Sequence, residues 1–356
     1  MADDLTFDDA RDEDELDELA DEIAARHFDR RQVLYGAGGA ILGLFAGTPL
    51  ARAGRLIAGG AQNTKQIAFA QPDTSFAGYK FLLQGAKSAG RARGYDILES
   101  HANHQLDAQV SEITTWVAQR IGGMIVLPLD NNAMAPLIRR AHQNGVKFLD
   151  YSDKALPGVD GWVIFNNLQG AHQVGRYAGR WVNRVLHGRA KVGLLTHEVQ
   201  KTGRDRIHGA VAALKRVAPK ARVVARHEGV LAAECLTVTQ SMLQAHPDLN
   251  VIFCIADDGA LGAEKAFMQR HPSRARQRRM FIAGWDGTVP VFQKILHGSV
   301  IRATGALDLV GIGAASIRAT ANAIEGKKPT QINYPYVLVP QTNRAVVRKF
   351  LRKYGA

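Results

Sequence analysis

Short runs of apolar residues alternate with longer amphipathic stretches over most of the chain. The runs are rich in Val, Ile and Leu, which is typical of strands covered on both faces. They predict strands at Gln66–Ala70, Asp96–Glu99, Gly123–Leu127, Val146–Asp150, Trp162–Phe165, Lys191–Leu195, Arg222–Ala225, Val251–Ile255, Met280–Ala283 and Val300–Thr304. The stretches between them have helical periodicity, for example at Tyr79–Arg93, Asp107–Arg120, Gly175–Leu186, Arg206–Val217 and Leu309–Ile324. This alternation predicts an α/β fold of parallel sheets with right-handed crossovers.

The first 53 residues differ from the rest in composition. Acidic residues dominate up to Glu22, and Arg30-Arg31 then precedes a mildly apolar, Gly-rich run that ends at Ala51-Arg52-Ala53. Paired arginines before such a run and a small-residue site are typical of a twin-arginine export signal. Arg30 and Arg31 are therefore predicted to direct export, with 1–53 an acidic extension plus a cleaved signal peptide. An uncleaved membrane anchor is the alternative, although the glycines make the run a poor spanning segment.

Charge is unevenly placed along the 356 residues. Residues 1–53 hold 13 acidic and 5 basic residues, so the remainder carries 20 acidic and 40 basic ones. The bases are spread over many predicted helices rather than gathered on one DNA-reading motif, which argues against a nucleic-acid partner. One dense group is predicted to be a solvated loop: Arg270, Arg274, Arg276, Arg278 and Arg279. Attraction to an anionic membrane or to an acidic partner is the alternative.

The chain has two cysteines. Cys235 lies at the start of a predicted helix and Cys254 inside the next predicted strand. These two places can be close in an α/β unit, so a disulfide and two buried free thiols both remain open.

Polar and aromatic residues follow the ends of several predicted strands. Parallel sheets bind ligands beyond the carboxyl ends of their strands, so these residues are candidates for a binding site. Carboxylates and a guanidinium make charge-assisted bonds to hydroxyl groups, and aromatic rings cover the apolar side of a sugar. The combination therefore suits a polyhydroxylated ligand. The residues at these strand ends include Phe76, Asp150, Tyr151, Arg204, Asp257 and Asp286.

At these positions the chain resembles the sugar-binding proteins of bacterial ABC transporters, of the ribose/galactose-binding class (type I periplasmic binding proteins). The resemblance extends from about Lys65 to Asn343 and rests on the order and spacing of several short patterns. These are Phe81-Leu82-Leu83-Gln84-Gly85-Ala86, the segment from Gln109 to Val126, Ala256-Asp257-Asp258-Gly259-Ala260-Leu261-Gly262-Ala263 and Gly284-Trp285-Asp286-Gly287.

The resemblance implies two doubly wound parallel-sheet lobes joined by a three-segment hinge. The first lobe would comprise 54–165 and 307–335, and the second 166–306 and 336–356. It also implies roles for individual residues. Phe76 would stack on the sugar ring, Asp150 and Asp286 would accept hydrogen bonds from hydroxyls, and Arg204 would donate to the ligand. Asn167 would lie at a crossing between the lobes, and Tyr151 and Asp257 complete the predicted ligand-binding set.

The chain departs from the family pattern at several expected polar contacts. Ala256 stands where an Asn usually precedes Asp257, Leu307 replaces an expected Gln, and Tyr151 stands where an Arg often follows the fourth-strand Asp. Val230 or Leu231 takes the place of an aromatic residue. A pocket less polar than a pentose or hexose site is expected, so a deoxy sugar, a polyol or a similar compound becomes a candidate ligand.

The implied function is capture of a small carbohydrate by hinge closure and its delivery to an ABC permease in the inner membrane. A periplasmic monomer without cofactor or metal is expected. No G-x-S-x-G elbow occurs, and His101 and His104 lack an obvious further metal ligand, so catalysis is not expected. A periplasmic sensor that signals to a chemoreceptor or kinase is the alternative that the sequence leaves open.

Overall fold

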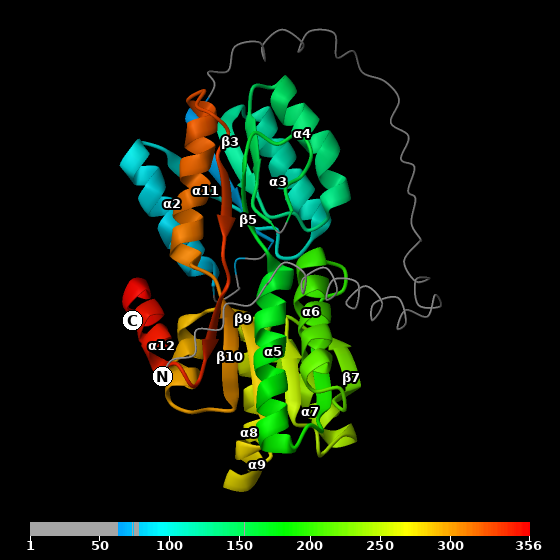
Figure 1. Cartoon of the computed structure of the whole chain (residues 1–356). Coiled ribbons are helices and arrows are strands. Elements are labelled where there is room, and N and C mark those ends of the chain that lie inside the picture. Colours follow the sequence, from blue (N-terminus) through cyan, green and yellow to red (C-terminus); the bar gives the residue numbers. More distant parts are fainter. Residues whose placement is uncertain (1–62, 73, 75–77, 153) are drawn as a thin grey trace, which may run out of the picture.

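The computed structural model describes residues 63–72, 74, 78–152 and 154–356, which form two α/β lobes, each built on a six-stranded sheet (Figure 1). The predicted signal with Arg30 and Arg31, and the predicted stacking residue Phe76, lie outside the described residues. The fold class predicted from the hydrophobic pattern is confirmed. No helix in the described part of the chain is long and apolar enough to cross a membrane.

The sheet of the first lobe is entirely parallel. In sheet order its strands are β11 (Gln331–Tyr334), β5 (Trp162–Phe165), β4 (Lys147–Asp150), β3 (Ile121–Val126), β1 (Asn63–Ala70) and β2 (Asp96–Glu99). Helices cover both faces, and every residue of β3 is buried as the continuous apolar pattern predicts (Figure 1). The helices are α2 (Tyr79–Arg93) and α11 (Leu309–Ile324) on one face, and α3 (Leu106–Ala118) and α4 (Met134–Gln143), which follows the short 3-10 helix η1 (Asn131–Ala133), on the other.

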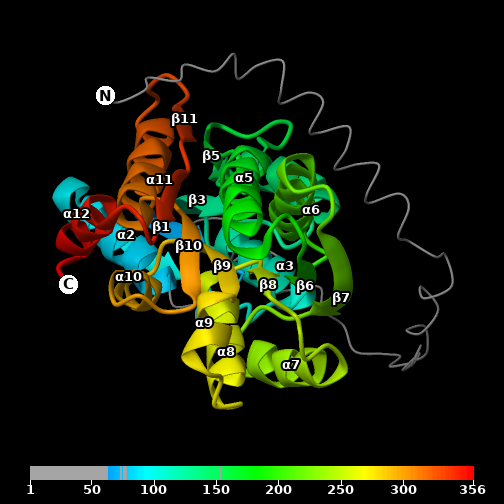
Figure 2. The ribbon, with the colours of Figure 1, turned by 60° about the horizontal axis from the view of Figure 1, so that its bottom comes forward.

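The sheet of the second lobe is parallel except for β12, which pairs antiparallel with β10. Its strands, in sheet order, are β12 (Val337–Pro340), β10 (Ile301–Ala306), β9 (Phe281–Asp286), β8 (Val251–Cys254), β6 (Lys191–Thr196) and β7 (Arg222–Glu228). Helices again flank the sheet, with α5 packed along α6 and α7 beside α8 (Figure 2). They are α5 (Asn167–Leu186), α6 (Lys201–Val217), α7 (Ala232–Ala245), α8 (Asp257–Met268), α9 (Arg274–Arg278), α10 (Val289–Leu296) and α12 (Arg344–Tyr354).

The chain passes between the two sheets three times, after β5, after β10 and after β11. The first passage leads through Asn166 into α5, whose first turn Asn166 caps by accepting a hydrogen bond from the backbone N–H of Gln169. Leu307 and Asp308 form the second passage, and Pro335 with Tyr336 the third. Three short connections between two intact sheets are an arrangement that suits hinge motion of the lobes.

The arginine-rich segment is a short helix rather than the loop that was predicted. Ser273 caps α9 by accepting from the backbone N–H of Arg276. The guanidinium of Arg276 then donates to the carbonyl oxygens of Pro247 and Leu249 and lies 5.3 Å from the ring centre of Phe267. A cap and one arginine that ties the segment to the lobe therefore stabilise a helical turn in a sequence with little apolar periodicity.

Both cysteines are buried free thiols, which decides between the two alternatives that the sequence left open. Cys235 lies in α7 and Cys254 in β8, as the helix and strand patterns predicted. Burial raises the pKa of Cys235 to about 12, so its thiol stays protonated and unreactive near neutral pH.

Because His172 on α5 is buried, we expect the protein to lose stability in mild acid. Its side chain is 1% exposed, and neither ring nitrogen has a hydrogen-bond partner among the residues that the structure describes. Burial, together with Arg176 and Arg216, lowers its pKa from 6.5 to about 4. Between these values the unfolded chain binds a proton that the folded chain does not. The free energy of unfolding should therefore fall by up to about 3 kcal/mol as pH drops from 6.5 to 4.

Urea unfolding of the wild type and of His172→Leu at pH 7 and pH 4.5 measures this effect. The difference in unfolding free energy between the two pH values should shrink in His172→Leu and stay unchanged in His227→Gln, because His227 is exposed. An equal acid response in the wild type and His172→Leu would exclude His172 as its source.

Candidate ligand-binding site

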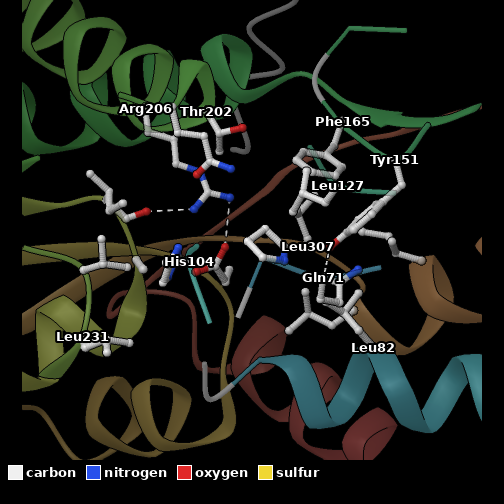
Figure 3. Close-up of a pocket in the computed structure, with 18 residues that line it drawn as sticks. Gln71, Leu82, His104, Leu127, Tyr151, Phe165, Thr202, Arg206, Leu231 and Leu307 are labelled. Carbon is white, nitrogen blue, oxygen red and sulfur yellow. Dashed lines mark hydrogen bonds and ion pairs between the residues drawn. The ribbon is translucent and has the colours of Figure 1, made fainter. Parts of the chain in front are cut away.

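A cavity of about 110 Å³ lies between the lobes, where the carboxyl ends of strands from both sheets meet (Figure 3). A space of this size holds on the order of ten water-sized spheres, which limits a ligand to a small molecule. Its described lining residues are Gln71, Pro72, Leu82, His104, Leu127, Tyr151, Phe165, Gln200, Thr202, Arg206, Val230, Leu231, Ile255, Ala256, Asp286, Leu307, Leu309 and Ile312.

Arg206 and Asp286 form a buried ion pair on the second-lobe side of the cavity. Nη2 of Arg206 lies 2.9 Å from Oδ1 of Asp286, and both side chains are at most 8% exposed. Burial alone lowers the pKa of Arg206, but the carboxylate of Asp286 and the hydroxyl of Tyr336 outweigh burial and raise it above its ordinary value. Arg206 is therefore a fixed cation that holds one oxygen of Asp286 in place.

The salt bridge with Arg206 uses one of the two carboxylate oxygens of Asp286. Oδ2 is buried and has no hydrogen-bond partner in the described part of the chain. Asp286 ends β9 with φ +106°, a backbone conformation that is strained for any residue with a side chain. A strained residue with an unsatisfied acceptor, lining a cavity, indicates a place where a ligand donates a hydrogen bond.

Gln71 and Tyr151 form the matching polar pair on the first lobe. The hydroxyl of Tyr151 donates to Oε1 of Gln71 at 3.2 Å, while Nε2 of Gln71 is buried and has no hydrogen-bond partner within the described residues. Burial raises the pKa of Tyr151, which keeps the phenol protonated as that donor. The ring of Tyr151 is held between Phe69 and Phe165, with ring centres 5.9 and 5.6 Å away. The pair therefore contributes polar groups to the cavity wall on the side opposite Arg206 (Figure 3).

The sequence matches the family described as "Periplasmic binding protein domain" over residues 67–328, nearly three quarters of the chain. The chain belongs to this family. It is 25% identical over 264 residues to the ribose import binding protein RbsB of Escherichia coli, covering 71% of this chain and 82% of that protein. It is also 25% identical over 249 residues to the D-apiose import binding protein of Paraburkholderia graminis, covering 69% and 77%. The structure of a myo-inositol binding protein from Caulobacter, bound to myo-inositol, superposes with a TM-score of 0.72 at 20% identity and covers 81% of this chain and 97% of that one.

The structure of this periplasmic binding protein brings Tyr151 and Asp286 together among the lining residues, on opposite lobes. Asn167 lies directly behind them, where its Oδ1 accepts hydrogen bonds from Nε of Arg206 and from the hydroxyl of Tyr336. Because Asn167 begins α5 and Tyr336 precedes β12, this network connects Arg206 to two of the interlobe passages. Asn167 therefore orients Arg206 rather than lining the cavity itself.

Asp150 and Asp257 are buried outside the lining. Oδ2 of Asp150 accepts from the Ser152 hydroxyl and the backbone N–H of Leu156, which fixes the loop after β4. Asp257 accepts from Thr288 and Thr304, which joins α8 to β10 and to the loop after β9. Burial and the nearby Asp286 raise the pKa of Asp257 to about 8. Both carboxyl groups therefore fix the conformation of the backbone that surrounds the site.

Arg206, which was not among the predicted site residues, lines the cavity, whereas Arg204 lies in a neighbouring hollow beside Gln200. Nη1 of Arg204 donates to the backbone carbonyl of Glu198. Helix α6 begins at Lys201, not at Arg206 as predicted, so Thr202 and Arg206 are one turn apart and face the cavity together. Arg204 points elsewhere on the same helix. The i, i+4 spacing of Thr202 and Arg206 was the signal that could have identified them.

No group of three or more His, Cys, Asp or Glu side chains that could hold a metal occurs among residues 63–72, 74, 78–152 and 154–356. That the site binds neither metal nor cofactor stays a prediction. The described lining residues offer hydrogen bonds and apolar contact to a ligand.

Proposed function

We propose that this protein captures a small carbohydrate or carbohydrate-like solute in the periplasm by closure of its lobes and delivers it to an ABC permease. The observation that carries the proposal is that two buried polar residues line one cavity from different lobes, Gln71 and Asp286, and that each has an atom without a hydrogen-bond partner among the described residues, Nε2 and Oδ2 respectively. A ligand can bond to both only when the lobes are together, so binding favours the closed form. The import functions named for the relatives support the same role.

Thermal unfolding of the full chain against pentoses, hexoses, deoxy sugars and polyols tests this function. A ligand that binds only the folded chain raises the unfolding free energy by about 2.7 kcal/mol at 100 times its Kd. The shift should be lost in Arg206→Lys and kept in Arg204→Lys, because only Arg206 lines the cavity. The absence of any shift over the whole panel would contradict a carbohydrate ligand.

We also propose that the protein acts as a monomer. Among the described residues, the large hydrophobic side chains that are exposed are Val199 and Met268, which are too few for an extended apolar interface. Sedimentation velocity should give a mass near 38.7 kDa for the full chain, or less after signal cleavage. A stable dimer at micromolar concentration would contradict this.

Export should depend on the arginine pair, since the receptor for such signals reads both guanidinium groups. Replacing Arg30 and Arg31 by Lys is expected to leave the protein in the cytoplasm at its full length. Fractionation with immunodetection measures this, and Arg26→Lys, outside the pair, is the control. Periplasmic recovery of the double variant at the wild-type level would exclude a twin-arginine signal.

A further inference from the structure

The cavity combines a few fixed hydrogen-bonding groups with a wall that is mostly apolar. Eleven of the eighteen described lining residues are Leu, Ile, Val, Phe, Pro or Ala. They come from both lobes, so an apolar surface faces the ligand from more than one direction. From the first lobe and the passages these are Pro72, Leu82, Leu127, Phe165, Leu307, Leu309 and Ile312, and from the second Val230, Leu231, Ile255 and Ala256.

Arg206 has little hydrogen-bonding capacity left for a ligand. A guanidinium carries five N–H groups. Nε donates to Asn167, Nη1 to the carbonyl of Ile255, and Nη2 to both Tyr336 and Asp286. Four of the five donors therefore bond to protein, and at most one remains for the cavity.

Three other polar side chains of the lining each have one group bonded to protein. The Tyr151 hydroxyl donates to Gln71, Thr202 Oγ1 accepts from Asn167, and Gln200 Nε2 donates to the carbonyl of Pro128. Two lining side chains, Asp286 and Gln71, each have one buried atom without a hydrogen-bond partner among the described residues, Oδ2 and Nε2 respectively. His104 also lines the cavity, with its ring centre 5.8 Å from that of His197. Figure 3 shows Gln71 beside Tyr151 at one side of the cavity and Arg206 with Thr202 at the other.

A sugar with hydroxyl groups all around its ring needs more partners than this. Its remaining hydroxyls would be buried against Leu82, Leu307 or Phe165, and each buried hydroxyl without a partner weakens binding by about tenfold. A methyl, methylene or thioether group at the same place gains by leaving water.

Resting on the proposed carbohydrate-binding function, we infer that the ligand is an amphipathic carbohydrate: hydroxyls on two sides of it meet Asp286 and Gln71, and the part between them is deoxygenated or bears an alkyl or alkylthio group. One hydroxyl donates to Oδ2 of Asp286 on the second lobe, and another accepts from Nε2 of Gln71 on the first. The substituent lies against the apolar wall formed by Leu82, Leu307 and Ile312. The ligand's class is thus set by how few polar atoms the described lining offers.

Calorimetric titration of the full chain with matched pairs tests this inference. The pairs are D-ribose with 5-methylthioribose, D-galactose with D-fucose and D-mannose with D-rhamnose. Within each pair one hydroxyl of the first sugar is replaced, by a methylthio group in the first pair and by hydrogen in the other two. The substituted or deoxy member of at least one pair should bind about tenfold tighter or better than its parent. Parents that bind as tightly as their partners in every pair overturn the ligand class and leave the proposed function intact. No binding by either member of any pair overturns the ligand class and also contradicts the carbohydrate function.

A variant test uses Leu307, which is 3% exposed and lines the cavity. Leu307→Gln adds a donor and an acceptor to the apolar wall and should shift the preference toward the hydroxylated parent by about tenfold. Leu83→Gln is the matched control, because Leu83 is next to the lining residue Leu82 but does not line the cavity. An unchanged preference in folded Leu307→Gln counts against the inference. The matched-pair titrations on the wild type decide the question should that variant fail to fold.

Discussion

Replacing Asp286 with alanine should abolish ligand binding and lower the unfolding free energy by about 3–5 kcal/mol. Arg206 is 6% exposed and faces Asp286 at 2.9 Å, so removal of the carboxylate leaves a buried cation with only neutral acceptors. Alanine also inherits φ +106° without a side chain that can bond locally. The same change removes Oδ2, a buried acceptor of a residue that lines the cavity. Urea unfolding and calorimetric titration measure the two losses separately.

Asp286→Asn removes the negative charge of the side chain and nearly keeps its shape. Asparagine tolerates a positive φ better than alanine and keeps one oxygen for Arg206, so the loss of stability should be smaller than in Asp286→Ala. Its amide nitrogen would face the cavity where the carboxylate oxygen had accepted a hydrogen bond, so affinity should still fall at least about a hundredfold. Asp248→Ala breaks an exposed ion pair with Lys191 and should change neither quantity measurably. Wild-type affinity in Asp286→Ala would contradict the assigned role.

The strands were predictable from the sequence where burial is complete. β3, β8 and β9 are buried along their whole length, and their continuous apolar runs identify them without knowledge of the fold. β11 and β12 were not predicted. They are short and partly exposed, and β11 reads Gln331-Ile332-Asn333-Tyr334, so its place in the sheet comes from pairing with β5 rather than from its own pattern.

The start of α5 was predicted too late because glycine lowers helix propensity. Gly170 and Gly175 are nevertheless helical, since a Cβ at Gly175 would lie 2.3 Å from the carbonyl oxygen of Ala210 on α6, and one at Gly170 would lie 2.5 Å from the ring of Tyr336. The close approach of α5 to α6 requires Gly175, and that of α5 to Tyr336 requires Gly170, so tertiary packing outweighs the local preference.

Strand ends were a partial guide to the site. Tyr151 and Asp286 line the cavity because the end of a parallel strand fixes its position in the fold. The same reasoning cannot separate Asp286 from Asp150 or Asp257, since which way a carboxylate turns depends on neighbouring hydroxyls and N–H groups such as those of Ser152 and Thr288. Gln71, directly after β1, is the strand-end residue that the sequence reasoning passed over.

Gly313→Ala should destabilise the protein by about 1–3 kcal/mol, although the same change in an ordinary helix stabilises it by about 0.5–1 kcal/mol. Helices α2 and α11 touch through glycines: a Cβ at Gly313 would lie 1.9 Å from the carbonyl oxygen of Leu82, and one at Gly85 would lie 2.0 Å from that of Val310. Ordinary contact begins at 3.4 Å, so the helices must separate by more than an ångström.

This separation should also weaken ligand binding, because the two helices carry part of the cavity wall. Leu82 lies on α2, and Leu309 with Ile312 lies on α11. Urea unfolding and titration of Gly313→Ala, Gly85→Ala and the double variant measure both effects. The double variant should lose less stability than the two single losses combined, since one separation of the helices relieves both clashes. Ser88→Ala, exposed on α2, is the control and should stay within about 0.5 kcal/mol of the wild type. A Gly313→Ala variant more stable than the wild type would mean that the helices do not pack this closely, and that the apolar wall of the cavity is not fixed by their contact.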